Sequence, residues 1–383
     1  MTPPVGPIIS ILDALSIILN SFLKRDHQKN LEEFIRKEIN CQNIWHFNNA
    51  RSALYVGLKS IANLSPEKKE VLVPIYTCST VLNSILKADL VPIPYDIDQA
   101  NLGSSCKSIE DNINENTLAI IASGLYGIGI DIMKIKNVSS KKNIYLIEDI
   151  SQNYLSDYIN TRMGSVGDLA IISYGMSKPI NAIGGGSLIS NTIEMNTKIN
   201  KLFDEQKKFS SMDFIKSCTR TLLLSIIIKP WVFKVVTIFY KKFSSSSNSK
   251  QGESKKMGAI QLSFINNELK KINATNNSRN ENFAQLEKII EKINGLETLN
   301  INSTSNHYLR LPVLCEKDRS SWIKKIRSCG LWASDELYEP TCKINSENVT
   351  SFPNYLKIKD RLILISIHPH INKATIQKLQ SLI

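Results

Sequence analysis

Five short apolar runs, each separated from the next by a segment long enough for a helix, constrain the fold of this chain most strongly. The runs are residues 71–74, 90–94, 118–122, 144–147 and 169–173. Runs of this length, rich in Ile, Leu and Val, are typical of strands that are buried on both faces. Strands that alternate with helix-length segments predict βαβ units. The sequence therefore predicts an α/β fold with a mainly parallel sheet.

The second half of the chain predicts a smaller domain. Residues 243–256 are rich in Ser and Lys and are typical of a linker or loop. After them we expect one long amphipathic helix over residues 259–293. Strand-like and helical segments then alternate, at residues 308–314, 319–328, 362–367 and 373–383. We therefore expect a large domain over residues 1–245 and a smaller C-terminal α+β domain over residues 246–383.

Charge and cysteine patterns exclude several classes of protein. The 383 residues carry 47 Lys and Arg against 35 Asp and Glu, a formal net charge of +12. The basic residues are spread out without interleaved aromatic residues, which argues against nucleic-acid binding and suits small anionic substrates. The seven cysteines form no CxxC pair, and no histidines cluster at metal-ligand spacing. We therefore expect neither a disulfide framework nor a metal site.

Two apolar segments raise the question of membrane contact. Residues 8–23 could form an amphipathic helix, but the basic residues follow the apolar run, which argues against a secretion signal. Residues 221–240 belong to an apolar helical insertion at about 211–242, and Lys229, Pro230 and Lys234 interrupt them too often for a membrane span of roughly 20 residues. Both segments could lie on an anionic membrane surface. We favour the other interpretation, in which they pack on the protein's own body or on a partner subunit.

Three segments far apart in the sequence carry residues suited to one chemistry. Residues 48–53 form a turn that opens a helix, where main-chain amides and the helix dipole could bind a phosphate. Asp149 ends an apolar strand, and this position suits either a functional acid or a carboxylate that only caps the strand end. Another strand delivers Ser173, and Lys178 follows between that strand and the Gly184–Gly186 triplet. This context favours a functional lysine over a solvated surface charge.

Together these groups are what pyridoxal phosphate needs in a protein. A lysine forms the Schiff base, an aspartate pairs with the pyridinium nitrogen, and a helix N-terminus holds the phosphate. At this point the chain resembles the DegT/DnrJ group of sugar-nucleotide aminotransferases, from about Asn48 to the C-terminus. The motifs that carry the resemblance are Ala50-Arg-Ser-Ala-Leu-Tyr, Val73-Pro-Ile-Tyr-Thr-Cys, Leu125-Tyr-Gly, Ile147-Glu-Asp-Ile-Ser-Gln, Gly164-Ser-Val-Gly-Asp, Ser173-Tyr-Gly-Met-Ser-Lys and Ile367-His-Pro. The resemblance implies the type I pyridoxal-phosphate fold, with a mainly parallel seven-stranded sheet in the large domain.

The resemblance also implies a role for particular residues. Lys178 would hold the cofactor, Asp149 would contact its ring nitrogen, and Gln152 would lie beside the ring. Ala50 and Arg51 would offer main-chain amides to the phosphate, and Ser173 would add its hydroxyl.

The residue that stacks on the ring in this family, commonly an aromatic, is Cys78 here. Tyr76 either compensates or is an ordinary core aromatic, and the sequence favours neither interpretation.

Other positions depart from the family pattern or carry no expected role. Gly124 stands where many members have a histidine. Ser254 replaces an asparagine that reaches the neighbouring subunit's phosphate, although Lys255 or Lys256 could substitute for it electrostatically. We expect structural roles for the three histidines near family motifs and a packing role for the tyrosine of Tyr338-Glu-Pro; the histidines are His46, His307 and His368.

The resemblance predicts an enzyme that transfers an amino group from an amino acid, by resemblance glutamate, to a keto group of a nucleotide-linked sugar. Its products would serve surface polysaccharide or glycan synthesis. A branch of the family that removes a hydroxyl has a histidine in place of the lysine, so Lys178 argues against that branch. We expect a cytoplasmic homodimer, and the sequence leaves open whether it also makes peripheral contact with the inner face of the membrane. The alternative is a non-catalytic or regulatory cofactor-binding protein at a membrane surface.

Overall fold

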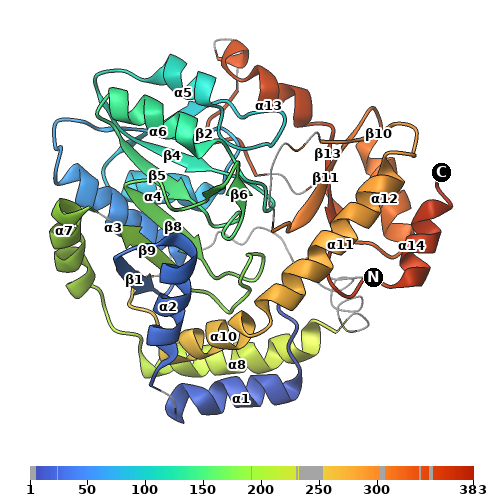
Figure 1. Ribbon diagram of the computed structural model, residues 1–383, viewed down its shortest axis with the longest axis horizontal. Coiled ribbons are helices and arrows are strands. Elements are labelled where there is room, and N and C mark those ends of the chain that lie inside the picture. The colour runs from blue at the N-terminus through green and yellow to red at the C-terminus, as the bar shows by residue number, and fades with distance from the viewer. Residues whose placement is uncertain are drawn as a thin grey trace.

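A seven-stranded sheet forms the centre of the larger part of the protein (Figure 1). The computed structural model describes residues 6–23, 25–190, 192–229, 232, 253–299, 301, 307–335, 338–344 and 348–383. The strands follow the order β1-β9-β8-β5-β4-β2-β3. Their bounds are β1 Asn43–Phe47, β2 Glu70–Pro74, β3 Val91–Tyr95, β4 Thr117–Ser123, β5 Tyr145–Asp149, β8 Leu169–Ser173 and β9 Gly186–Ser190.

The five predicted apolar strands are all present, and they pair in parallel as β3-β2-β4-β5-β8. The mainly parallel α/β fold is therefore confirmed. The two strands that the apolar runs did not indicate, β1 and β9, pair antiparallel to each other, and β9 pairs antiparallel to β8.

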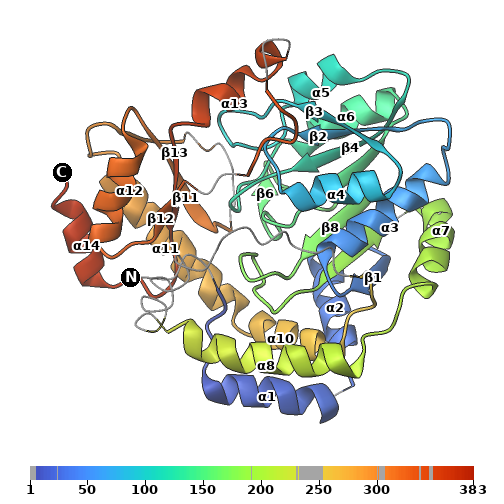
Figure 2. The same cartoon turned by 180° about the vertical axis from the view of Figure 1, so that it is seen from behind.

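Two helical layers bury the two faces of this sheet (Figures 1 and 2). Successive strand residues point to opposite layers. Thus Ile120 and Leu146 lie in one core cluster, whereas Ile121 and Ile147 lie in the other. The helices of one layer are α3 Ala50–Ala62, α4 Ser79–Lys87 and α7 Ile193–Asp204, and those of the other include α2 His27–Ile39, α5 Cys106–Asn112 and α6 Ile132–Lys141. A two-stranded hairpin, β6 Asp157–Tyr158 and β7 Thr161–Arg162, follows β5.

A smaller antiparallel sheet carries the C-terminal part of the chain, which confirms the expected α+β organisation. Its strand order is β10-β11-β13-β12. The strands are β10 Leu296–Thr298, β11 Arg310–Cys315, β12 Ala333–Ser334 and β13 Leu362–Ser366. The accompanying helices are α12 Arg319–Ser328, the short 3₁₀ turn Val349–Ser351, α13 Pro353–Ile358 and α14 Lys373–Gln380.

The prediction of one long helix over residues 259–293 is wrong. The segment forms two helices, α10 Ala259–Leu269 and α11 Ile272–Ile290. Residues of α10 join the core beneath the seven-stranded sheet, whereas α11 packs on the small sheet. The break at Lys270 and Lys271 allows α10 to pack in one core and α11 in the other. At the break, the ammonium of Lys271 lies 3.3 Å from the Asp13 carboxylate.

The expected linker and domain boundary are only partly described. The boundary between residues 245 and 246 lies outside the described residues, as does most of the linker. The described end of the linker is tied to the segments that follow β1 and α7, because Asn48 N donates to Lys255 O at 2.9 Å and Lys256 N donates to Lys207 O at 2.9 Å.

Both apolar segments begin as helices in the described part of the chain. α1 spans Ile11–Leu23, and α8 spans Ser211–Ile227 behind a capping box made by Ser210 and Asp213. α1, α8 and α10 run side by side at one end of the protein (Figures 1 and 2). Residues 230, 231 and 233–242 of the insertion lie outside the described residues. Among the described helices, none combines the length and apolar character that crossing a bilayer requires.

Candidate active site

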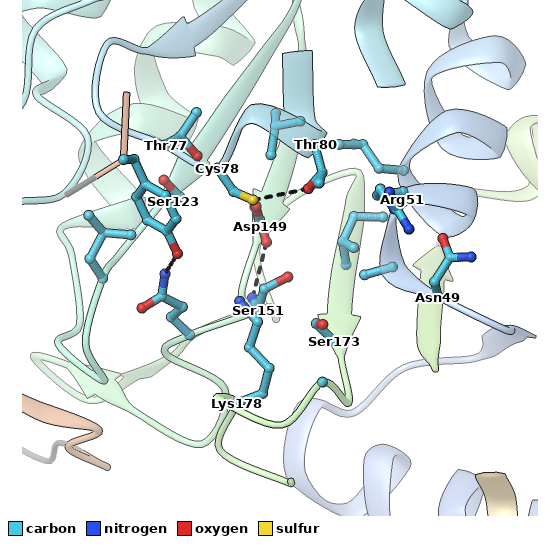
Figure 3. Close-up of a pocket in the computed structure, with 18 of the residues that line it drawn as sticks. Asn49, Arg51, Thr77, Cys78, Thr80, Ser123, Asp149, Ser151, Ser173 and Lys178 are labelled. Atoms are coloured by element: carbon cyan, nitrogen blue, oxygen red, sulfur yellow. Dashed lines mark hydrogen bonds between the residues drawn. The ribbon is translucent and has the colours of Figure 1, made fainter. Parts of the chain in front are cut away.

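A cavity of about 350 Å³ opens where the parallel strands of the large sheet end (Figure 3). Ligands of open α/β sheets bind at this edge, and small-molecule cavities usually measure roughly 300–1,000 Å³. Side chains that follow four strands enter the cavity: Cys78 after β2, Ser123 at the end of β4, Asp149 at the end of β5 and Ser173 at the end of β8. Seven of the eight predicted site residues line it, namely Ala50, Arg51, Cys78, Asp149, Gln152, Ser173 and Lys178.

The start of α3 forms one wall of the cavity. Asn49 caps this helix, and its side-chain oxygen accepts a hydrogen bond from Ser52 N at 2.9 Å. β9 passes tightly against the helix start, because a Cβ added to Gly186 would lie 2.5 Å from Ala50 N. The first turn of a helix has main-chain amides without acceptors in the helix and a positive dipole end. With the Arg51 side chain also at the cavity wall, this corner suits a phosphate.

Lys178 extends from the turn after β8 toward Asp149 (Figure 3). Burial lowers the pKa of the Lys178 amine, and the Asp149 carboxylate opposes that shift. Asp149 is oriented by the next turn, since its carboxylate accepts a hydrogen bond from Ser151 N at 3.1 Å. A buried amine that loses its proton readily is a better nucleophile and base than an exposed one.

The turn that carries Lys178 is held from several sides. Ala182 N donates to Tyr174 O at 3.1 Å, and Tyr174 N donates to Gly185 O at 3.1 Å. From α11, the fully buried guanidinium of Arg279 donates to Pro179 O at 3.3 Å. Arg279 is therefore a positioning residue that the sequence motifs did not indicate.

The acid next to Asp149 has a structural task. Glu148 points to the other side of the strand and is buried, which raises the pKa of its carboxyl. Its oxygens accept hydrogen bonds from the backbone amides of Gly164, Val166 and Gly167 at 2.7, 2.8 and 2.6 Å. The Gly164-Ser-Val-Gly-Asp motif is thus a loop wrapped around the Glu148 carboxylate.

A hydrogen-bond chain closes the side of the cavity nearest the small domain. Gln152 Nε2 donates to the Tyr338 hydroxyl at 2.6 Å, and Gln152 Oε1 accepts from Tyr126 N at 3.2 Å. Tyr338 lines the cavity, so the packing role expected for it is incomplete.

Cys78 lies at the start of α4, with its sulfur 3.1 Å from the Thr80 hydroxyl.

Tyr76 does not line the cavity. Its ring is 1% exposed, and its hydroxyl is hydrogen-bonded to that of Tyr126. The ring centroid lies 5.6 Å from that of Tyr338 and 6.0 Å from that of Tyr355. The structure therefore favours the core-aromatic interpretation of Tyr76.

The departures from the family pattern have steric and electrostatic explanations. A Cβ on Gly124 would lie 2.3 Å from Asn153 Nδ2 and 2.4 Å from Ile128 O, so a histidine does not fit there. Lys255 Nζ lies 2.7 Å from the Asp213 carboxylate, and Lys256 Nζ lies 3.3 Å from that of Asp204. Both lysines are therefore engaged within the chain, which does not favour a substitution for Ser254.

None of the three histidines lines the cavity. His46 is buried, with Nδ1 2.8 Å from the Ser187 hydroxyl and Nε2 3.7 Å from Glu32, whose pKa it lowers to about 2. Burial lowers the pKa of His307 to about 4 and that of His368 to about 3, so both are neutral near pH 7.

Arg310 is a candidate site residue that the motifs missed. It begins β11, and its guanidinium carbon lies 4.8 Å from the ring centroid of Trp332. Arg310 is not among the residues that line the cavity, but its charge contributes to the lowered pKa of Lys178 and acts on Tyr126 and Tyr338 as well, so it lies within electrostatic range of the site. Within the described ranges, no carboxylate forms an ion pair with Arg310. A lone arginine in an apolar strand segment was the available sequence signal.

The residues present fit pyridoxal phosphate. The cavity has the volume of a small-molecule site, a helix N-terminus at one end, and a lysine and an acid close together within it. These are the binding and reactive groups that this cofactor requires.

The comparison with protein families gives one match over most of the chain. The profile of the DegT/DnrJ/EryC1/StrS aminotransferase family matches residues 11–383.

Curated relatives match shorter stretches. GDP-perosamine synthase of Vibrio cholerae is 26% identical over 144 residues, which are 38% of this chain and 39% of the relative. The UDP-4-amino-4,6-dideoxy-N-acetyl-beta-L-altrosamine transaminase of Campylobacter jejuni is 28% identical over 201 residues, 50% of this chain and 52% of the relative. The chain thus spans between about two fifths and half of the length of these relatives.

Solved structures match over nearly the whole chain, at identities that show the fold alone. The Helicobacter pylori aminotransferase PseC, described as involved in pseudaminic acid biosynthesis, has a TM-score of 0.78 at 16% identity, with 100% of this chain and 97% of that chain covered. The E. coli GDP-4-keto-6-deoxy-D-mannose-3-dehydratase, solved with bound hydrated pyridoxal phosphate, has a TM-score of 0.74 at 15% identity, with 100% and 99% covered.

Proposed function

The chain belongs to the DegT/DnrJ/EryC1/StrS aminotransferase family, and from this premise we propose that it transfers an amino group from an amino acid to a keto group of a nucleotide-linked sugar. The single observation that carries the proposal is that Lys178 extends toward Asp149 in a cavity that ends at the α3 N-terminus. The relatives named as a GDP-linked and a UDP-linked sugar enzyme support the substrate class. A role in surface polysaccharide or glycan synthesis is part of the same proposal.

When bound, pyridoxal phosphate supplies a covalent carrier for the amino group and an electron-withdrawing ring. In the proposed site, the α3 N-terminus, Arg51 and Ser173 would hold the phosphate, and Asp149 would pair with the ring nitrogen. The Lys178 amine would anchor the cofactor. The same amine would take a proton from the substrate carbon and return one. Gln152, fixed by hydrogen bonds to Tyr126 and Tyr338, would help to orient the ring.

We assign the carboxylate of the amino donor to Arg310, with glutamate as the proposed donor. A guanidinium without a carboxylate partner in the described part of the chain is available for a bidentate contact. The stacking of Arg310 on Trp332 limits its movement before the donor arrives.

Changing Arg310 to Gln is expected to raise KM for glutamate by roughly 10–100-fold, because hydrogen bonds to charged groups contribute about 1.5–3 kcal/mol. KM for the keto-sugar should stay within about twofold. Initial rates over both substrate concentrations measure the two values. Arg310→Lys should recover part of the loss, and Arg361→Gln, which removes a guanidinium paired with Glu297 at 3.2 Å, is the matched control. An unchanged glutamate KM in Arg310→Gln would remove Arg310 from donor binding.

The proposal includes a homodimer in the cytoplasm with peripheral contact at the inner face of the membrane, and no nucleic-acid partner. The net charge of +12 supports anionic nucleotide substrates, since a positive field raises their encounter rate.

An absorption experiment tests the proposed function. The purified chain, loaded with pyridoxal phosphate, should have a visible band that shifts when glutamate is added. A panel of UDP-, dTDP- and GDP-linked keto-sugars should then restore the band and yield an amino-sugar detectable by mass spectrometry. A coloured protein inert to every donor and acceptor would favour the non-catalytic alternative, and a colourless one would end the proposal.

A further inference from the structure

Two neighbouring helices present large apolar side chains to solvent. We call this surface the α1–α8 apolar face. Of the nineteen exposed large apolar side chains in the described part of the protein, eleven lie on these two helices. They are Ile11, Leu12, Leu15, Leu19, Phe22 and Leu23 on α1, and Met212, Ile215, Leu222, Leu223 and Ile226 on α8. The two helices lie side by side along one end of the molecule (Figures 1 and 2).

The fold does not require this apolar face. α1 already buries one side against the core, with Ala14 at 0% and Ile17 at 1% exposure, and Ser263 on α10 donates to Ile17 O at 2.7 Å. Leu12 and Leu19 belong to a second apolar stripe of the same helix, 77% and 58% exposed. A helix that needs one buried stripe normally places polar residues on its other side. A second stripe of this size marks a binding surface.

On α8 the exposed apolar residues also form one stripe. Met212, Ile215, Leu222 and Ile226 recur at helical spacing, whereas Thr221 and Ser225 are buried on the opposite side. The small polar residues thus face the protein and the large apolar ones face outward. The two helices are joined at Phe22 and Phe214, whose ring centroids lie 4.9 Å apart.

The unpaired charges on these two helices are positive. The acid on each helix is paired within the protein, since Asp13 lies 3.3 Å from Lys271 Nζ and Asp213 lies 2.7 Å from Lys255 Nζ. Lys216 on α8 is exposed, and no acid pairs with it within the described residues. The sequence then continues with further apolar residues and four more lysines, at positions 229, 234, 241 and 242.

We propose that the α1–α8 apolar face binds the surface of an anionic phospholipid bilayer, with both helices parallel to it. An amphipathic surface with a basic edge gains both from apolar burial at the headgroup boundary and from attraction to anionic lipids. A second copy of this face is a poorer occupant, because it would offer the same basic edge, with the acids of both helices already paired. The inference develops the membrane contact of the proposed function and rests on that part of it alone. It places sugar amination at the bilayer surface.

Vesicle flotation of the intact chain tests the inference. Wild type should float with vesicles of phosphatidylcholine and phosphatidylglycerol and much less with phosphatidylcholine alone. The double variants Leu12→Gln with Leu19→Gln, and Leu223→Gln with Ile226→Gln, should each weaken binding at least about tenfold, because they remove apolar burial. Lys216→Glu should weaken binding to the anionic vesicles alone, by roughly tenfold.

The matched control is Leu86→Gln with Ile193→Gln. These side chains are 57% and 78% exposed on α4 and α7, away from the α1–α8 apolar face, and their replacement should leave flotation unchanged. Circular dichroism checks that each variant is folded. If a double variant does not fold, the loss of binding to anionic vesicles in Lys216→Glu still tests the inference. Wild type that fails to float with anionic vesicles would overturn the inference. So would variants that turn a dimer into monomers in sedimentation without changing flotation, because a second copy would then cover the face.

The same samples are assayed for transamination in solution without vesicles. The face variants should retain full activity there, since the cavity lies at the sheet edge and not on α1 or α8. Normal flotation in a protein without any transaminase activity would count against the proposed chemistry and leave the membrane surface intact.

Discussion

Replacing Lys178 with Ala is expected to lower turnover by at least about 10⁴-fold, because in the proposed mechanism one amine serves as both the anchor of the cofactor and the proton carrier. The fold should survive. Burial disfavours the charged form of this amine, and no hydrogen bond from it is present among the described residues. We therefore expect the unfolding midpoint to stay within a few degrees, about what a change of 1 kcal/mol produces in a chain of this size.

Single-turnover assays with glutamate and a keto-sugar measure the loss. Borohydride reduction followed by peptide mapping should place the cofactor adduct on the peptide that contains residue 178 in wild type and find none in the variant. Lys141→Ala, an exposed lysine at the end of α6, is the control and should keep both activity and adduct. Full turnover in Lys178→Ala, or an adduct at another lysine, would refute the assignment.

Asp149→Asn has the second largest expected effect, a loss of roughly 10²–10³-fold in kcat. A preorganised charge that meets charge developing in the reaction commonly contributes this much. The Asp149 carboxylate also raises the pKa of Lys178, so its removal should lower that pKa further. A pH titration of the reactivity of the Lys178 amine in the cofactor-free protein should therefore show a lower midpoint in the variant.

The neighbouring acid provides a matched control for this prediction. Glu148→Gln removes the charge that three backbone amides of the 164–167 loop contact, on the other side of the strand from the cavity. It should lower the free energy of unfolding while turnover per folded molecule falls by less than about tenfold. Equal turnover in Asp149→Asn and wild type, with an unchanged titration, would exclude Asp149 from the chemistry.

Much of the large sheet and its site follows from local sequence. Apolar runs at 71–74 and 118–122 predict buried strands because their side chains must leave water on both faces. The carboxyl ends of parallel strands lie at the same edge of a sheet. Asp149 and Ser173, which end two neighbouring parallel strands, therefore line the same cavity. The motifs and their order then identify the family.

Other features depend on contacts that no local pattern contains. The helical periodicity of residues 259–293 is continuous, yet two separate cores divide the segment at Lys270. Tyr76 was equally suited to the cavity and the core, and packing against Tyr355 and Tyr126 placed it in the core.

The sequence by itself determined the α/β class, the parallel strands and the proposed reactive pair Asp149 and Lys178, because backbone geometry and strand-end position follow from neighbouring residues. Only the tertiary structure decided that Arg310 of the small sheet lies within electrostatic range of Lys178, and that α1 and α8 lie side by side at one end of the molecule, where the rings of Phe22 and Phe214 are in contact. Both arrangements join segments far apart in the chain. The free energy that stabilises them comes from packing and charge interactions between elements, and these interactions form only when the whole chain has folded.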